Sequence, residues 1–273
     1  MRKIGNIKHK SIIILLMPAL LAGFIFCCGF MHTVSEGEKF TVELLNSYTT
    51  YFDGKNEARS HNIRLAASLI DGTVLQNGEI FSFNERVGQR TSERGFKHAA
   101  IIENGEFVEG VGGGVCQVST TLYNAALLSG CRIVEYHPHS LAVSYVPPSR
   151  DAMVSGSFFD LKFENATGST VYIKSVAGEN YVSFKLYGRD FGIKYSLNSQ
   201  VTGTIEPPEE FTDDIALVRS GRTGTISEGY LTVTKNGFSR VIFLRRDKYA
   251  PQKKITLKTE EEPLEIPENN LPF

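Results

Sequence analysis

A run of almost wholly apolar residues, Ser11 to Met31, follows a basic cluster at the start of this 273-residue chain. About 20 apolar residues are enough to cross the hydrocarbon core of a membrane as a helix. Because positively charged flanks stay in the cytoplasm, the body of the chain is expected outside the cell membrane. The run is longer than the apolar part of a usual signal peptide, and no clear cleavage site follows it. The sequence therefore predicts a single-pass membrane anchor over residues 1–31, with a cleaved signal peptide as the alternative.

The composition of the rest is that of a globular protein. Hydrophobic residues make up 41% and charged residues 22%, close to the averages of folded domains. The formal net charge of −1 gives no diffuse basic surface for nucleic acid, so no nucleic-acid partner is expected. The exception is the segment 259–273, where five glutamates and three prolines predict a disordered acidic tail.

Three consecutive glycines, Gly112 to Gly114, precede the pattern of an amphipathic helix. From Val115 onward apolar residues recur at spacings of three and four, and Gly130 ends the pattern. This predicts a helix of about four turns that begins near Cys116. A cysteine in the first turn faces free backbone N–H groups and the positive end of the helix dipole, which stabilise a thiolate. The glycines permit close approach of a substrate and can aim N–H groups at an oxyanion.

The body contains one further cysteine, Cys131, 15 residues after Cys116. At opposite ends of one helix the two would lie about 22 Å apart, whereas a disulfide needs Cα atoms within about 7 Å. We therefore expect no disulfide between them. Zinc binding by these cysteines with His137 and His139 is the weaker alternative, because the cysteines lack the paired spacing of zinc sites. No metal ion and no cofactor are predicted.

Two histidines follow the cysteine in the segment Tyr136 to Ser140, and Asp151 comes after a proline-rich turn. In an extended segment His137 and His139 would project to the same face. Thiol peptidases and transglutaminase-like enzymes use the order cysteine, histidine, carboxylate, in which imidazole takes the thiol proton and the acid orients the imidazole. We therefore consider Cys116 a candidate nucleophile, either histidine a candidate base and Asp151 the orienting acid. The alternative is a buried structural cysteine beside two histidines that cap a proline turn.

These motifs also carry a family resemblance. The stretches Gly78 to Asn84, Val87 to Thr91, Gly112 to Asn124 and Tyr145 to Pro147, with His139-Ser140, resemble the VanW family over roughly Tyr51 to Lys174. The resemblance implies a membrane-anchored protein of the bacterial cell envelope and no settled biochemical activity. Candidate binding residues are the glycines and polar residues of the longest motif, together with an arginine that can anchor a carboxylate: Gly112, Gly113, Gly114, Gln117, Ser119, Thr120 and Arg90. The alternative for Arg90 is a solvated basic loop.

The predicted fold class is α+β, with a mainly antiparallel sheet and two principal helices. The second of these helices is the one near Cys116, and the first is expected over Asn62 to Ile70, with Ser60 or Asn62 as its N-cap. A hairpin through Asn104-Gly105 is expected to lead to the glycine run, and a type I′ turn at Asn236-Gly237 predicts another near the C-terminus. The expected divisions are an anchor at 1–31, a stalk at 32–51, a VanW-like domain at 52–200, a β-hairpin unit at 201–258 and a tail at 259–273.

Two classes of function follow. The first is a thiol enzyme with a Cys-His site that acts on peptide or amide bonds of the cell wall. The second is a non-catalytic module that binds cell-wall peptides or an envelope protein, in which the glycine loop is a close-approach surface.

Overall fold

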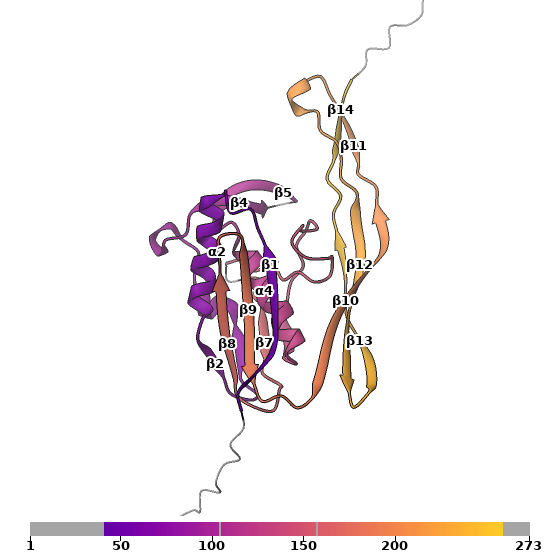
Figure 1. Ribbon diagram of the computed structural model, residues 1–273. Coiled ribbons are helices and arrows are strands. Elements are labelled where there is room, and N and C mark those ends of the chain that lie inside the picture. The colour runs from indigo at the N-terminus through magenta and orange to yellow at the C-terminus, as the bar shows by residue number, and fades with distance from the viewer. Residues whose placement is uncertain (1–40, 104, 157, 259–273) are drawn as a thin grey trace, which may run out of the picture. The chain divides into compact units, whose positions relative to one another are not determined.

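The computed structural model describes residues 41–103, 105–156 and 158–258 (Figure 1). All of them lie in one compact unit of the chain, which begins at Thr41. The described part is α+β, as predicted, with mainly antiparallel sheets and few helices. The predicted anchor at 1–31 and tail at 259–273 lie outside the described residues. Within the described ranges, no helix has the length and apolar character needed to span a membrane.

A four-stranded antiparallel sheet organises the domain, with the strand order β1 (Glu43–Tyr51), β9 (Tyr181–Gly188), β8 (Val171–Ala177) and β2 (Thr73–Leu75). The prediction of a stalk over residues 32–51 is wrong for the part that forms β1. This segment pairs with β9 along its length, and Thr50 bonds through its hydroxyl to the buried hydroxyl of Thr121, 2.7 Å away. These two interactions make β1 part of the core.

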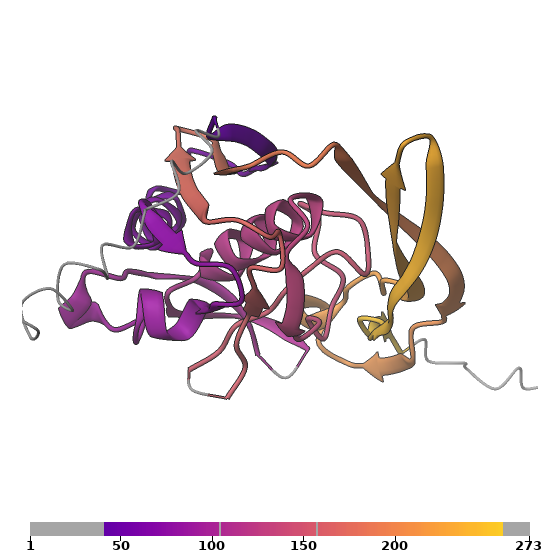
Figure 2. The ribbon, with the colours of Figure 1, turned by 90° about the horizontal axis from the view of Figure 1, so that it is seen from below.

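Two 14-residue helices, α2 (Glu57–Ile70) and α4 (Val115–Leu128), cover one face of this sheet (Figure 2). The predicted α4 is confirmed within one residue at its start. The predicted α2 is confirmed, but its N-cap is Asn56, whose side chain accepts a hydrogen bond from the Arg59 N–H at 3.0 Å. The expected caps, Ser60 and Asn62, are buried inside the helix instead.

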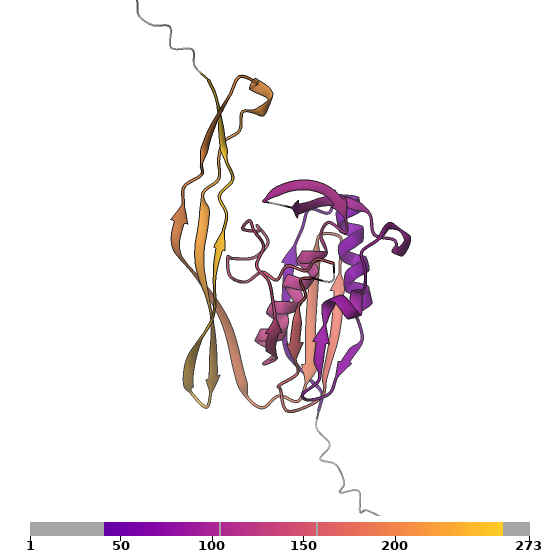
Figure 3. The same cartoon turned by 180° about the vertical axis from the view of Figure 1, so that it is seen from behind.

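Short elements connect the sheet to the helices. The strand Ile80–Ser82 ends at Ser82 because the Ser82 side chain accepts a hydrogen bond from the Glu85 N–H and so caps a helix that begins at Phe83. The hairpin that leads to the glycine run is present (Figure 3). The elements are β3 (Ile80–Ser82), α3 (Phe83–Val87), η1 (Ser92–Arg94), β4 (His98–Glu103), β5 (Glu106–Val111), β6 (Arg132–Glu135) and β7 (Lys162–Glu164).

The C-terminal part is built on a long three-stranded antiparallel sheet. Its strands are β10 (Ile193–Ile205), β12 (Gly224–Lys235) and β13 (Phe238–Tyr249). The predicted turn is confirmed, because Asn236 and Gly237 both have positive φ angles, 51° and 82°. The pairing of β10 with β12 was not predicted. The remaining elements are η2 (Ile215–Leu217) and the parallel pair β11 (Glu209–Thr212) and β14 (Lys254–Leu257).

Candidate functional site

The glycine run before α4 is a tightly packed turn. Gly112 and Gly114 have φ angles of 88° and 105°, which disfavour any other residue. A Cβ atom on Gly113 would lie 2.6 Å from the carbonyl oxygen of Ala100. The side chain of Asn62 donates a hydrogen bond to the Gly113 carbonyl at 3.0 Å. The run therefore holds the first turn of α4 in a fixed place against β4 and α2.

Replacing Gly113 with alanine is expected to lower the free energy of unfolding by about 2 kcal/mol or more, because a methyl group has no room against the backbone of β4. Gly203 is the matched control, since a Cβ there would meet its nearest neighbour at 3.5 Å, an ordinary contact. Urea unfolding of both variants measures the difference. Equal stabilities for the two alanine variants would contradict the packing of the run.

Cys116 lies in the first turn of α4 and is half-buried. Its thiol donates to the carbonyl of Val154 at 3.3 Å and interacts with the side chain of His139. Burial alone would raise the pKa of the thiol. The hydrogen bond and positive charge of His139 outweigh it, so the pKa of Cys116 lies below its ordinary value. The thiol therefore ionises more readily than a free cysteine.

The imidazole of His139 is held by Asp151. Oδ2 of Asp151 accepts two hydrogen bonds of 2.7 Å, one from the backbone N–H of His139 and one from the ring atom Nδ1. This leaves Nε2 as the ring nitrogen that is free to face Cys116. Burial alone would lower the pKa of His139, but the hydrogen bonds to Asp151 and Cys116 raise it to about 9. The arrangement favours a thiolate beside a protonated imidazole.

Asp151 is itself buried and is held by two residues of β13. Tyr249 donates its hydroxyl to Oδ1 of Asp151 at 2.5 Å, and Arg245 donates to the same atom at 3.3 Å. Arg245 also donates to the backbone carbonyl of Asp151 at 2.5 Å and to Asp247 at 2.6 Å. Burial alone would raise the pKa of Asp151, but the hydrogen bond and charge of His139 and the charge of Arg245 keep it below its ordinary value. The carboxylate is therefore ionised and fixed in place.

Sequence analysis missed Arg245 and Tyr249, which lie 94 and 98 residues after Asp151. A signal was present in the sequence. Arg245, Asp247 and Tyr249 alternate along one strand, so their side chains share a face, and all three are buried. A buried arginine needs a charged partner.

His137 has a different environment from His139. Its Nε2 lies 3.0 Å from a carboxylate oxygen of Glu135, and its ring stacks at an angle against Phe159 with centroids 4.7 Å apart. The two histidines were expected to project to the same face if the segment were extended; residues 136–139 are not in a strand, and the two rings contact different carboxylates. The structure brings Cys116, His139 and Asp151 together and leaves His137 with Glu135.

The polar residues that follow Cys116 on α4 bond to the protein itself. Ser119 donates to the carbonyl of Ala152 at 2.6 Å, and Thr120 accepts from the N–H of the same residue at 2.9 Å. Gln117 donates to the carbonyl of Tyr51 at 2.9 Å. All three side chains are buried. Their position accounts for how the loop after Asp151 is fastened to α4 rather than for contact with a ligand.

Cys131 lies apart from this group. It is buried just beyond the end of α4 and is not disulfide-bonded, and Cys116 is also free, so the expectation of no disulfide between them is confirmed. Burial raises the pKa of the Cys131 thiol to about 12, which makes it unreactive near neutral pH. Within the described ranges, no group of three or more His, Cys, Asp or Glu side chains is arranged to hold a metal ion.

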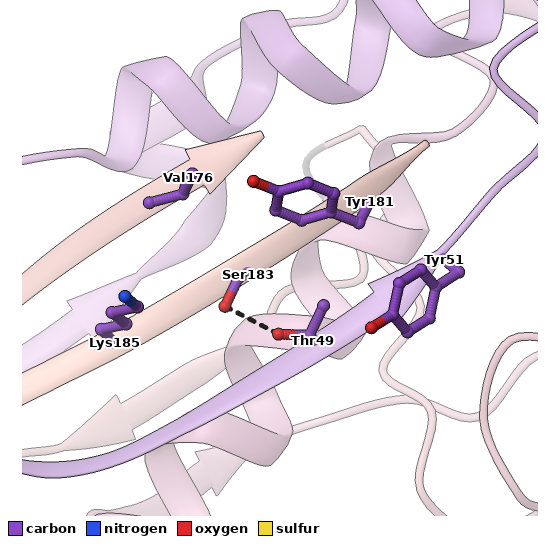
Figure 4. Close-up of a pocket in the computed structure, with 6 residues that line it drawn as sticks. All are labelled: Thr49, Tyr51, Val176, Tyr181, Ser183 and Lys185. Atoms are coloured by element: carbon purple, nitrogen blue, oxygen red, sulfur yellow. Dashed lines mark hydrogen bonds between the residues drawn. The ribbon is translucent and has the colours of Figure 1, made fainter. Parts of the chain in front are cut away.

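A shallow pocket of about 440 Å³ lies over β1, β8 and β9 and does not include Cys116, His139 or Asp151 (Figure 4). Tyr51 and Tyr181 stand at one end of it, and Thr49 donates to Ser183 at 2.8 Å on its floor. Its lining is completed by Val176 and Lys185. The pocket is on the sheet and offers aromatic and hydroxyl groups, not a nucleophile.

Comparison with known proteins links the chain to one family. The family model described as VanW like protein matches residues 58–187. The uncharacterized protein YoaR of Bacillus subtilis (strain 168) is 41% identical over 175 residues, which are 64% of this chain and 56% of that protein. The vancomycin B-type resistance protein VanW of Enterococcus faecalis (strain ATCC 700802 / V583) is 30% identical over 135 residues, 47% of this chain and 49% of that protein.

The chain spans about half the length of these two curated relatives. A solved structure, the crystal structure of HP0197-G5, covers 24% of this chain and 99% of its own at 17% identity, but its TM-score of 0.15 is too low to assign a fold. The matched segment contains Cys116, His139 and Asp151, whereas Arg245 and Tyr249 lie beyond it. Residues 58–187 therefore form a VanW-like domain, similar to parts of both relatives.

Proposed function

We propose that this protein is a thiol enzyme of the bacterial cell envelope that acts on peptide or amide bonds of the cell wall. The observation that carries the proposal is the 2.7 Å hydrogen bond between the His139 ring and Asp151, together with the interaction of His139 with the Cys116 thiol, whose pKa it lowers. The basic and apolar N-terminus supports attachment to the cell membrane with the body outside. The relative that is named as a vancomycin B-type resistance protein supports a setting in the cell envelope.

The chemistry follows from the positions of the three side chains. His139 takes the proton of Cys116, and the thiolate attacks the carbonyl carbon of a peptide or amide bond. Backbone N–H groups in the first turn of α4 stabilise the negative oxygen that forms, and the positive end of the helix dipole adds to this effect. His139 then gives its proton to the leaving amine, which leaves an acyl group on Cys116 as a thioester. Water or a second amine attacks the thioester and frees the thiol.

The pH dependence of Cys116 alkylation by iodoacetamide tests the proposal, with the labelled site identified by mass spectrometry of its peptide. In the native protein we expect Cys116 to stay reactive at pH values well below those at which a free thiol has become unreactive, because the imidazolium stabilises the thiolate. Replacing His139 with alanine is expected to lower the rate at about pH 6 by about tenfold or more. Replacing His137 with alanine is the matched control and is expected to leave the profile unchanged.

The pH profile of Cys116 alkylation in the native protein tests the proposed enzyme even if the His139 variant does not fold. A Cys116 that titrates like a free cysteine in the native protein contradicts the proposal. Buried Cys131 serves as an internal reference, because its raised pKa keeps it unlabelled over the same range.

A non-catalytic module for cell-wall peptides or an envelope protein is the second candidate, and the pocket between Tyr51 and Tyr181 favours it. Aromatic and hydroxyl groups on a sheet suit the binding of a peptide or sugar without chemistry. The same alkylation profile separates the two candidates, since only the enzyme needs an activated thiol. A thiol of ordinary reactivity therefore supports the module.

A further inference from the structure

We infer that Arg59 and Arg90 form an anion subsite beside Cys116 and that it receives a carboxylate group of the substrate. The inference rests on the proposed function, since it names the substrate class of the same site: an acyl compound with a free carboxylate close to the bond that reacts.

The first argument is position. The Cγ atom of Arg59, on α2, lies 3.0 Å from where a Cβ of Gly114 would stand. The Cβ atom of Arg90 lies 3.1 Å from the corresponding point at Gly112. The two arginines therefore pack against both ends of the glycine run that leads directly into Cys116.

The second argument is an unsatisfied donor. Nη2 of Arg59 donates to the side-chain oxygen of Gln117 at 2.8 Å, which fixes the guanidinium. Its Nη1 is buried and has no hydrogen-bond partner among the described residues. A buried donor on a charged group is costly when it has no acceptor. An oxygen atom of a bound ligand would supply the missing acceptor.

The third argument is uncompensated charge. Arg90 donates to the side chain of Asn84 at 2.8 Å and to the carbonyl of Gly88 at 3.1 Å, both of which are neutral oxygens. In the part of the chain that the structure describes, neither Arg59 nor Arg90 forms an ion pair with a carboxylate. Burial lowers the pKa of both guanidinium groups, but each stays charged at physiological pH. Asp160 acts on Arg90 only at longer range, without an ion-pair contact. Two half-buried guanidinium groups without a carboxylate in contact favour an anionic ligand.

Guanidinium groups bind carboxylates through paired N–H donors, so a carboxylate is the anion that fits best. The charge of Arg90 also contributes to the lowered pKa of Cys116, and Arg59 interacts with the same sulfur. A carboxylate bound between the two arginines would therefore lie close to the reacting sulfur. Neutral substrates would lack this anchor.

Two alkylating reagents of nearly equal size test the subsite. Iodoacetate carries a carboxylate and iodoacetamide is neutral, and both form a thioether with Cys116 and release iodide. The ratio of their rates cancels the fraction of thiolate and reports only the preference for the anion. Replacing Arg59 or Arg90 with glutamine is expected to lower this ratio by about threefold or more at constant ionic strength. Arg64→Gln, an exposed position on the same helix, is the matched control and is expected to leave the ratio unchanged.

A second measurement uses only the native protein. Acetate is expected to protect Cys116 from iodoacetamide in a saturable way, whereas acetamide at the same concentration is not. An unchanged ratio in Arg59→Gln and Arg90→Gln, or no protection by acetate, overturns the subsite. Neither result bears on the proposed enzyme, because the pH profile with neutral iodoacetamide tests that separately.

Discussion

Replacing Arg245 with methionine is expected to lower the free energy of unfolding by about 3–5 kcal/mol. The guanidinium is fully buried, donates to both Asp151 and Asp247, and lies 4.2 Å from the ring centroid of Tyr136. Removing it leaves the buried carboxylate of Asp247 without its cation and leaves Asp151 with the charge of His139 alone. Urea unfolding of the full chain measures the loss.

The neighbouring arginine is the matched control. Arg246 points away from the core, with 61% of its side chain exposed, and lies 3.7 Å from Glu228. An exposed ion pair of this kind contributes about 1 kcal/mol at most, so Arg246→Met is expected to change stability little. If the two methionine variants unfold at the same urea concentration, the network around Asp151 does not stabilise the fold as we describe.

Replacing Asp151 with asparagine is expected to affect both stability and thiol reactivity. The change keeps the shape of the side chain but removes the negative charge shared by His139, Arg245 and Tyr249. We expect the free energy of unfolding to fall by about 3 kcal/mol or more. Because Asp151 raises the pKa of His139, its loss lowers that pKa, and the imidazole then stabilises the thiolate less. Alkylation of Cys116 by iodoacetamide at about pH 6 is expected to slow by about tenfold or more.

A variant of a second buried carboxylate separates the effect on stability from the effect on thiol reactivity. Asp160 accepts hydrogen bonds from Ser82 at 2.6 Å and from the Asn84 N–H at 2.9 Å, but it does not contact His139. Asp160→Asn is expected to lower stability and to leave the pH profile of Cys116 unchanged. An Asp151→Asn protein with the native profile would show that Asp151 has a structural role only.

The position of Cys116 and its helix could be predicted from the sequence because both depend on local pattern. Glycines that permit positive φ angles, followed by apolar spacing of three and four, are enough to place Cys116 in the first turn of α4. The turn at Asn236-Gly237 was predictable for the same reason. The choice between His137 and His139 was not, since it depends on which ring reaches Asp151 across a loop that has no repeating pattern.

Contacts between distant parts of the chain could not be predicted from the sequence. Arg245 and Tyr249 reach Asp151 only because β13 packs against the loop that carries Asp151, and no local pattern specifies that contact. The start of α2 was misplaced because Asn62 is buried to bind the backbone of Lys97 and the carbonyl of Gly113. A polar side chain used in this way has the same sequence signature as a helix cap.

The dependence of Asp151 on β13 has a consequence for dividing chains of this kind. The family model ends at residue 187, yet Asp151 within it is held by Arg245 and Tyr249 from beyond that boundary. A fragment cut to the limits of the family model would keep Cys116, His139 and Asp151 but would lose these two contacts. Expression trials should therefore keep the C-terminal sheet together with the domain. The same holds when a role is transferred from one relative to another, because the two parts act as one structural unit.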